Sequence, residues 1–181
     1  DVIRDELLRN ASIVGITASN NHPASRVGNW RGYRPEGAED QISSPTVVVS
    51  YNFFETLGAE MVAGRGFERA FETDLREAYV INESAVKFFN LENPIGASLN
   101  GSSYNGQDWS NKNAKVIGVV KDFHFASLHA EIRPVVFSLS SEATTGINFM
   151  SVRISPNNID ETLSSIEAVW NEFAEGLPVN M

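Results

Sequence analysis

The sequence predicts an α+β fold in which a helix stands at each end of the chain and many short strands lie between. Short β-branched runs bounded by turn residues recur through the middle of the chain, a pattern that is typical of strands. The clearest helical pattern comes last, where apolar residues return at steps of three and four. Strands and helices do not alternate strictly, and no internal repeat is visible. We therefore expect a mixed fold whose long middle part forms a lobe of its own.

The first quarter of the chain predicts one helix followed by strands and loops. Residues 1–10 carry apolar side chains at helical spacing from the start, so we expect the end of a longer helix and a chain that is part of a longer protein. Residues 12–18 and 46–50 are rich in β-branched side chains and predict strands. Between them, residues 20–44 are polar and contain Gly and Pro, which predicts loops with short strands.

Short helices and further strands are predicted in the middle of the chain. Residues 51–57 predict a helix that Gly58 ends, because the position after a helix favours a left-handed residue. Asn82 is expected to cap a second helix that runs to Phe88 or Phe89, since its side chain can accept from the first free amides. Further strands are predicted at residues 60–63, 78–81, 115–120, 134–139 and 148–154.

The closing helix has a continuous apolar face, which predicts a docking surface for the rest of the chain. The residues on that face are Ile159, Leu163, Ile166, Val169, Trp170 and Phe173. Asp160 and Glu161 follow at its start, where the helix dipole favours negative charge.

Composition and charge exclude several classes of function. The chain is 42% hydrophobic and carries 14 Lys and Arg against 23 Asp and Glu, for a formal net charge of −9. Such a surface repels a phosphate backbone, so nucleic acid is not expected as a partner. The chain has no cysteine, which excludes disulfides and thiol chemistry. No apolar stretch approaches the roughly 20 residues that a membrane-spanning helix needs.

No sequence motif for a nucleophile, a metalloprotease helix, a phosphate loop or a dinucleotide site is present. The best metal candidate combines Asp122, His124 and His129, which could hold zinc if a loop brought them together. Alternation along a strand instead places Asp122 and His124 on one face and Phe123 on the other. We therefore predict neither a metal nor another cofactor.

The hypothesis that the protein is a hydrolase requires two carboxylates that meet in a cleft. Glu36, Glu39 and Asp40 could form such a pair only if the fold gathered them. They stand in a Gly-containing polar stretch, which predicts a solvated loop instead. We predict no catalytic residues.

Aromatic residues in irregular polar stretches are the candidate partner contacts. These are Trp30, Tyr33 and Trp109. Exposed aromatic side chains are common anchors of protein interfaces, although loop aromatics also cover local cores. We predict that these residues meet a partner on the surface of the middle lobe.

Several segments, taken together, resemble one known family. The first group runs from Val49 to Gly58 and continues with Gly64-Arg65-Gly66-Phe67. The second joins Val80–Ala85 to Asn93-Pro94-Ile95-Gly96, and the third joins Val116–Phe125 to Ser127-Leu128-His129 and Pro134. The closing stretch Trp170-Asn171-Glu172-Phe173 with Pro178 also fits. The chain thus resembles the MacB-like periplasmic core domain of FtsX-like ABC-transporter permeases, in the form common in Bacteroidetes.

The resemblance implies an architecture and a setting that composition could not show. It implies a porter-like α/β lobe formed by both chain ends, approximately 1–20 and 140–181 with part of the middle, and an inserted β-rich lobe at approximately 21–139. It implies a place on the periplasmic side of the bacterial cytoplasmic membrane. The implied partners are the protein's own transmembrane helices, a separate ATPase subunit or domain, and a periplasmic protein or a lipid or peptide cargo.

The function that the resemblance implies is mechanical and non-catalytic. Movement of transmembrane helices would shift the terminal helices and change how the outer lobe handles a substrate or partner during export or efflux. An extracytoplasmic sensor or ligand-binding domain is the alternative, and it would need a concave apolar pocket. A hydrolase that uses Glu36, Glu39 or Asp122 is a third reading.

Overall fold

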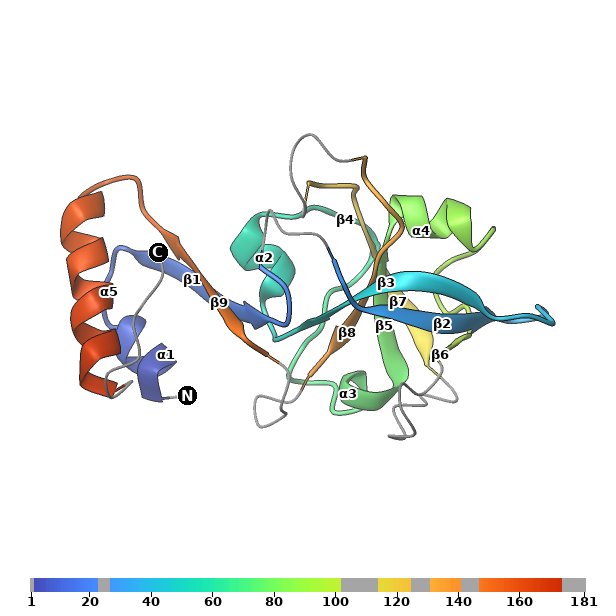
Figure 1. Ribbon diagram of the computed structural model, residues 1–181, viewed down its shortest axis with the longest axis horizontal. Helices are drawn as coiled ribbons and strands as arrows, with labels where there is room; N and C mark the ends of the chain where they lie inside the picture. The colour runs from blue at the N-terminus through green and yellow to red at the C-terminus, as the bar shows by residue number, and fades with distance from the viewer. Residues whose placement is uncertain (1, 23–26, 102–113, 125–130, 141–146, 174–181) are drawn as a thin grey trace.

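The computed structural model has a large mixed sheet with helices around it (Figure 1). It describes residues 2–22, 27–101, 114–124, 131–140 and 147–173. The prediction of a mixed α and β fold is confirmed. The division into two lobes stays a prediction.

The described chain contains five helices and nine strands. The helices are α1 (Val2–Leu7), α2 (Phe53–Leu57), α3 (Asp74–Glu77), α4 (Glu83–Phe88) and α5 (Ile159–Phe173). The strands are β1 (Ile13–Ser19), β2 (Trp30–Pro35), β3 (Ile42–Val49), β4 (Met61–Gly64), β5 (Ala78–Asn82), β6 (Leu99–Gly101), β7 (Lys115–Val120), β8 (Val136–Leu139) and β9 (Phe149–Ile154).

The strands form a nine-stranded sheet in the order β4-β7-β5-β8-β3-β1-β9, and β2 and β6 branch from β3. The β5–β7 and β3–β8 pairs are parallel, and the other pairs are antiparallel. The long strand β3 changes partner along its length: its first half pairs with β2 and its second half with β8. Strand β3 thereby joins β2 and β6 to the main sheet.

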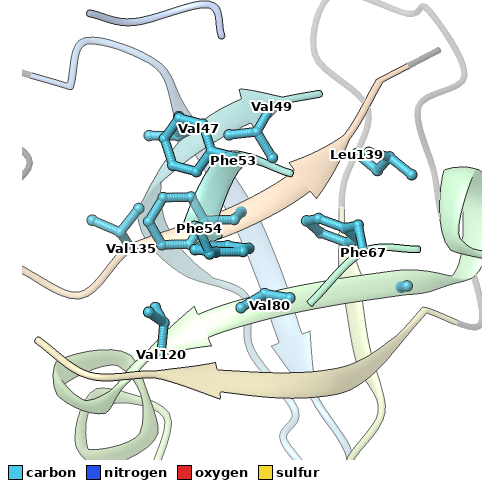
Figure 2. Close-up of a cluster of buried hydrophobic side chains, with 11 residues drawn as sticks. Val47, Val49, Phe53, Phe54, Phe67, Val80, Val120, Val135 and Leu139 are labelled. Carbon is cyan, nitrogen blue, oxygen red and sulfur yellow. The ribbon is translucent and has the colours of Figure 1, made fainter. Parts of the chain in front are cut away.

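Each face of the central strands packs against its own hydrophobic cluster. Val80 and Ile81 are adjacent in β5 and fully buried, but they belong to different clusters because neighbouring side chains point to opposite faces. Figure 2 shows the cluster that contains Val80 together with two phenylalanines of α2, Phe53 and Phe54. The other cluster lies on the face of the sheet that α4 covers, and it contains Ile81, Ala85 of α4 and Tyr33 of β2. Burial on both faces explains why β5 is apolar along most of its length.

Most predicted elements are present near their predicted bounds. Strand β7 and helix α5 coincide with the prediction. Gly58 ends α2 at a φ of 69°, and the Asn82 side chain accepts a hydrogen bond from the Ala85 amide at 3.1 Å, as predicted. Helix α3 was not expected, and neither was the pairing of β2 with β6. The predicted loop at 100–113 lies mostly outside the described residues.

Candidate functional site

Strands β1 and β9 form an antiparallel ribbon that leaves the main sheet. They pair from Ile13 with Ile154 to Ser19 with Phe149. By contrast, β1 pairs with β3 only at Ser19 and Val49. Among the described residues, the ribbon therefore joins the sheet through one short stretch of strand pairing, and the rest of it extends away (Figure 1). We refer to the elements from β2 to β8 with α2, α3 and α4 as the body.

Helices α1 and α5 pack against the end of the ribbon that lies farthest from the body (Figure 1). Leu7, Ile13, Ile16 and Ile166 form a buried cluster there that is separate from the two clusters of the body. The sequence predicted a docking face on α5 without naming what it contacts, and the structure places α1 and the ribbon against it. Because α1 begins and α5 ends on the same side of this helix pair, the two ends of the described chain emerge together (Figure 1).

Hydroxyl and amide side chains hold the place where the ribbon meets β3. The Ser50 Oγ lies 3.0 Å from the Thr17 Oγ1 and accepts from the Ala18 amide at 2.8 Å. The Asn20 Oδ1 accepts from the Val48 amide at 2.9 Å. These short polar side chains satisfy backbone groups where regular pairing stops, so the junction is ordered without being a continuous sheet.

A second polar network joins the ends of β5 and β7. The Asp122 Oδ1 accepts from the Asn82 Nδ2 at 2.8 Å and from the Ser84 amide at 3.0 Å, while its Oδ2 accepts from the Ser84 Oγ at 2.7 Å. The Glu83 carboxylate accepts from the Asp122 amide at 3.0 Å. The two segments around Asn82 and Asp122, which are distant in sequence, thus meet. The Asp122 carboxylate has a structural role at the start of α4.

This network engages the carboxylate of the candidate metal site. Asp122 is engaged by protein donors, and His124 is exposed. His129 lies outside the described residues. Within the described part of the chain, no group of three or more His, Cys, Asp or Glu side chains is placed to hold a metal ion.

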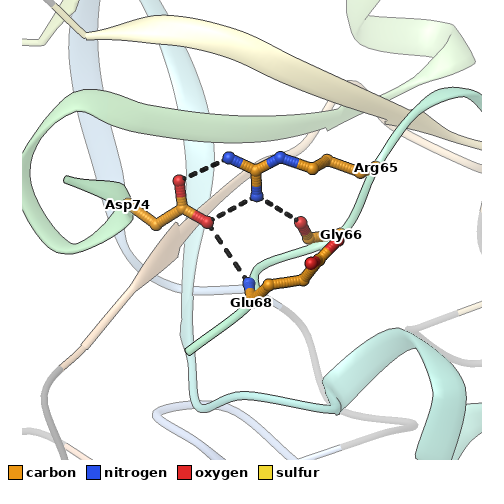
Figure 3. A network of polar contacts seen from close by, with 4 residues as sticks. All are labelled: Arg65, Gly66, Glu68 and Asp74. Atoms are coloured by element: carbon orange, nitrogen blue, oxygen red, sulfur yellow. Dashed lines mark hydrogen bonds and ion pairs between the residues drawn. The ribbon is translucent and has the colours of Figure 1, made fainter. Parts of the chain in front are cut away.

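The segment after β4 is fixed by an ion pair with a buried carboxylate (Figure 3). The Arg65 guanidinium donates to both Asp74 oxygens at 2.6 and 2.8 Å, and the Glu68 amide donates to the same carboxylate at 3.2 Å. This hydrogen bond with Asp74 raises the pKa of Arg65 above its usual value. The guanidinium also lies 3.9 Å from the Phe71 ring centre. The network therefore ties the segment after β4 to α3.

The structure describes two of the three predicted partner contacts, and they differ in exposure. Trp30 stands at the start of β2 and is 48% exposed, so it is available to a partner. Tyr33 is fully buried, and its hydroxyl lies 2.6 Å from the Thr46 Oγ1. The prediction of a surface role for Tyr33 is therefore wrong, because its ring packs edge-on against the rings of Tyr79 and Phe89 inside a hydrophobic cluster. Trp109 lies outside the described residues.

The acidic residues that a hydrolase would use are either exposed in a turn or engaged in a structural network. Glu36, Glu39 and Asp40 are exposed in the turn between β2 and β3. Asp122 belongs to the network at the start of α4. The structure brings none of the first three together with Asp122 in the contacts of the described residues.

Sequence reasoning missed the contacts between α2 and the ribbon. Gly15, in the interior of β1, lies against Thr56 of α2, and Arg153 of β9 donates to α2 carbonyls. A glycine inside an otherwise β-branched strand often marks a close approach of another segment. That signal was present in the sequence, but it did not identify the partner.

No protein-family model matches the chain, and no curated protein matches its sequence. Solved structures do match. The periplasmic region of MacB from Actinobacillus actinomycetemcomitans is 17% identical with a TM-score of 0.65, over 96% of this chain and 73% of that one. The extracellular domain of the noncanonic ABC-type transporter YknZ from Gram-positive bacteria is 16% identical with a TM-score of 0.65, over 97% and 83%.

A third solved structure is a Porphyromonas gingivalis domain described as part of a permease. It is 14% identical with a TM-score of 0.58, and the match covers 91% of this chain and 73% of that one. At these identities the comparisons establish a shared fold. None of the helices in the described ranges has the length and apolar character needed to cross a membrane.

Proposed function

We propose that this chain is a non-catalytic extracytoplasmic domain of an ABC-transporter permease, which passes movement of membrane helices to a partner or substrate during export. The observation that carries the proposal is the placement of the chain ends. Helix α1 begins and α5 ends on the same side of one helix pair (Figure 1). Transmembrane helices before and after the chain would therefore both act on this pair.

The separate cluster beneath the helix pair supports a mechanical role. Leu7 and Ile166 tie α1 and α5 to the same ribbon, so the two helices would move as one unit. The ribbon then connects this unit to the body through a short junction. A packed unit on a narrow connection is the arrangement that hinge motions use.

The two-lobe division belongs to this proposal. The porter-like lobe would comprise both chain ends, approximately 1–20 and 140–181, and the inserted lobe approximately 21–139. The similarity in fold to domains of MacB and YknZ supports this setting. The ATPase would be a separate subunit or domain on the other side of the membrane, and the domain itself would lie on the periplasmic side.

A partner protein or cargo would meet the body. Trp30 is the one predicted contact residue that the structure describes as exposed. Substitution of Trp30 by Ala should weaken partner capture without changing the fold, since its side chain is about half exposed.

The experiment that tests the proposal is to read the coding sequence on both sides of this chain and to purify the parent protein. We expect a hydrophobic stretch of about 20 residues on each side, and an ATPase, encoded in the same chain or beside it, that copurifies with the parent. A single membrane helix that leads to a kinase-like domain would refute the proposal and favour an extracytoplasmic sensor.

A further inference from the structure

Helix α2 touches the ribbon at a point where β1 has no side chain. A Cβ atom at Gly15 would lie 3.0 Å from the Thr56 Oγ1 and 3.5 Å from the Thr56 Cβ. Thr56 is itself buried, with 6% of its surface exposed. The end of α2 therefore rests directly on the backbone of β1, and any larger residue at position 15 would press against it.

The other strand of the ribbon holds the same end of α2 through a cation. The Arg153 Nη1 donates to the Glu55 and Thr56 carbonyl oxygens at 3.3 and 3.5 Å. The last carbonyls of a helix lack partners within the helix and attract positive charge. Gly58, whose φ is 69°, leaves the space that the guanidinium occupies, because a Cβ there would lie 3.1 Å from the Arg153 Nη1.

Helix α2 is at the same time part of the body. Phe53 and Phe54 are 1% and 4% exposed. Their ring centres lie 5.9 and 5.2 Å from that of Phe137 in β8. Helix α2 therefore cannot follow the ribbon if the ribbon turns, and the contact between them must open.

We propose that α2 is a latch, which holds the β1–β9 ribbon at one angle to the body and releases it when the α1–α5 pair is pulled. The contact is suited to release, because Arg153 is exposed and water can replace its long hydrogen bonds. Its use in transport rests on the proposed function. The latch itself is a property of this chain and can be measured without the rest of a permease.

The test measures the distance between the helix pair and the body. Because the chain has no cysteine, spin labels can be attached to Cys introduced at the exposed positions Lys87 in α4 and Ala168 in α5. Pulsed electron paramagnetic resonance then gives the distribution of distances between the labels. The variants are Arg153→Ala, which removes the cation, and Gly15→Ala, which presses on Thr56.

A third variant closes the latch covalently. The Cβ separation of 3.5 Å between positions 15 and 56 lies within the range of disulfides. Gly15→Cys with Thr56→Cys should therefore form a disulfide. In that variant the spin labels are attached through unnatural amino acids at positions 87 and 168, so that they do not react with the two cysteines. Lys121→Ala is the control for Arg153→Ala, because it removes an exposed cation that pairs with Glu60 at the other edge of the sheet.

The latch predicts opposite effects on the same distribution. Both Ala variants should increase the width of the distance distribution by a factor of about two, as expected when a hinge is freed. The disulfide should decrease this width, and Lys121→Ala should leave it unchanged. Distributions for Arg153→Ala and Gly15→Ala that overlay the parent distribution would overturn the latch. That outcome would not touch the proposed function, which depends on the flanking sequences and the ATPase.

Discussion

At the scale of single residues, the Asn82 side chain connects more of the body than any helix cap requires. It caps α4, and it also donates to Asp122 at 2.8 Å and to the Arg133 carbonyl at 2.9 Å. Its Oδ1 accepts from the Val135 amide at 2.8 Å. A buried amide with every group satisfied positions the ends of β5, β7 and β8 relative to one another.

Substitution of Asn82 by Ala should lower the free energy of unfolding by about 2–4 kcal/mol, because it removes the cap and leaves the Val135 amide buried without its partner. Urea denaturation monitored by circular dichroism measures this change. Asn29→Ala is the matched control, since Asn29 is exposed. Equal effects of the two substitutions would show that the network contributes nothing to stability.

Tyr33 gives the fold a sensitivity to alkaline pH. Burial raises the pKa of the Tyr33 phenol well above its usual range, so the folded protein keeps it neutral. In the unfolded chain a tyrosine ionises near pH 10. The stability that its burial contributes is therefore present below about pH 10 and is lost as the pH rises further.

The comparison of the parent chain with Tyr33→Phe isolates this effect. At neutral pH the parent should be more stable by about 1 kcal/mol, because the substitution removes the hydrogen bond with Thr46. Above pH 10 this advantage should shrink by about 1.4 kcal/mol per pH unit. Urea unfolding at a series of pH values measures it, and a constant difference up to pH 11 would contradict the assignment.

Of these residue roles, the sequence predicted those that depend on neighbours along the chain. The cap at Asn82 was predictable because an Asn before a helix accepts from amides a few positions away. Its contacts with Asp122 and Arg133 were not, since they join positions 40 and 51 residues apart. Tyr33 was misplaced because its polar neighbours in sequence say nothing of the strands β5 and β6 that enclose it.

At the scale of elements, the packing of helix α5 against α1 and the ribbon depends on the side chains at the centre of its apolar face. Ile166 is 8% exposed and packs in the cluster with Leu7, Ile13 and Ile16, whereas Ile159 on the same helix is 46% exposed. The apolar face that the sequence predicted is thus buried at its centre and open at its ends.

Ile166→Ala should destabilise the helix pair by about 2–4 kcal/mol, as expected for a buried methyl-bearing side chain that leaves a cavity. Ile159→Ala should cost less than about 1 kcal/mol, because the side chain is already in water. Hydrogen exchange followed by mass spectrometry should show faster exchange in α5 and β9 for Ile166→Ala, with β5 and β7 unchanged. Faster exchange throughout the sheet would mean that the ribbon and the body unfold as one unit.

Elements with strong local patterns were predictable, and elements held by distant contacts were not. Strand β7 is a β-branched run and α5 has helical periodicity over 15 residues. Helix α3 has only four residues and is fixed by the ion pair of its Asp74 with Arg65, so no periodicity could reveal it. The junction of the ribbon with α2 was missed for the same reason, since it joins β1, α2 and β9 from both ends of the chain.

At the scale of the whole molecule, the ribbon is the only strand pairing described between the helix pair and the body. If movement enters through α1 and α5, it must reach the body through the ribbon, and the angle of the ribbon to α2 must change. A covalent bond between these elements should therefore stop the movement without altering the fold of either part.

The disulfide between Gly15→Cys and Thr56→Cys tests this in the parent protein that we propose, reconstituted in vesicles with its ATPase. We expect transport and transport-coupled ATP hydrolysis to fall by about tenfold when the bond is formed and to recover when a reductant opens it, since the locked state withholds the hinge motion. Thr56→Cys alone is the matched control, because it leaves Gly15 in place, and it should retain transport under oxidising conditions. Full transport with a quantitatively formed disulfide would mean that the helix pair, the ribbon and the body move as one rigid unit, and that the movement is delivered to the partner without any change of angle at α2.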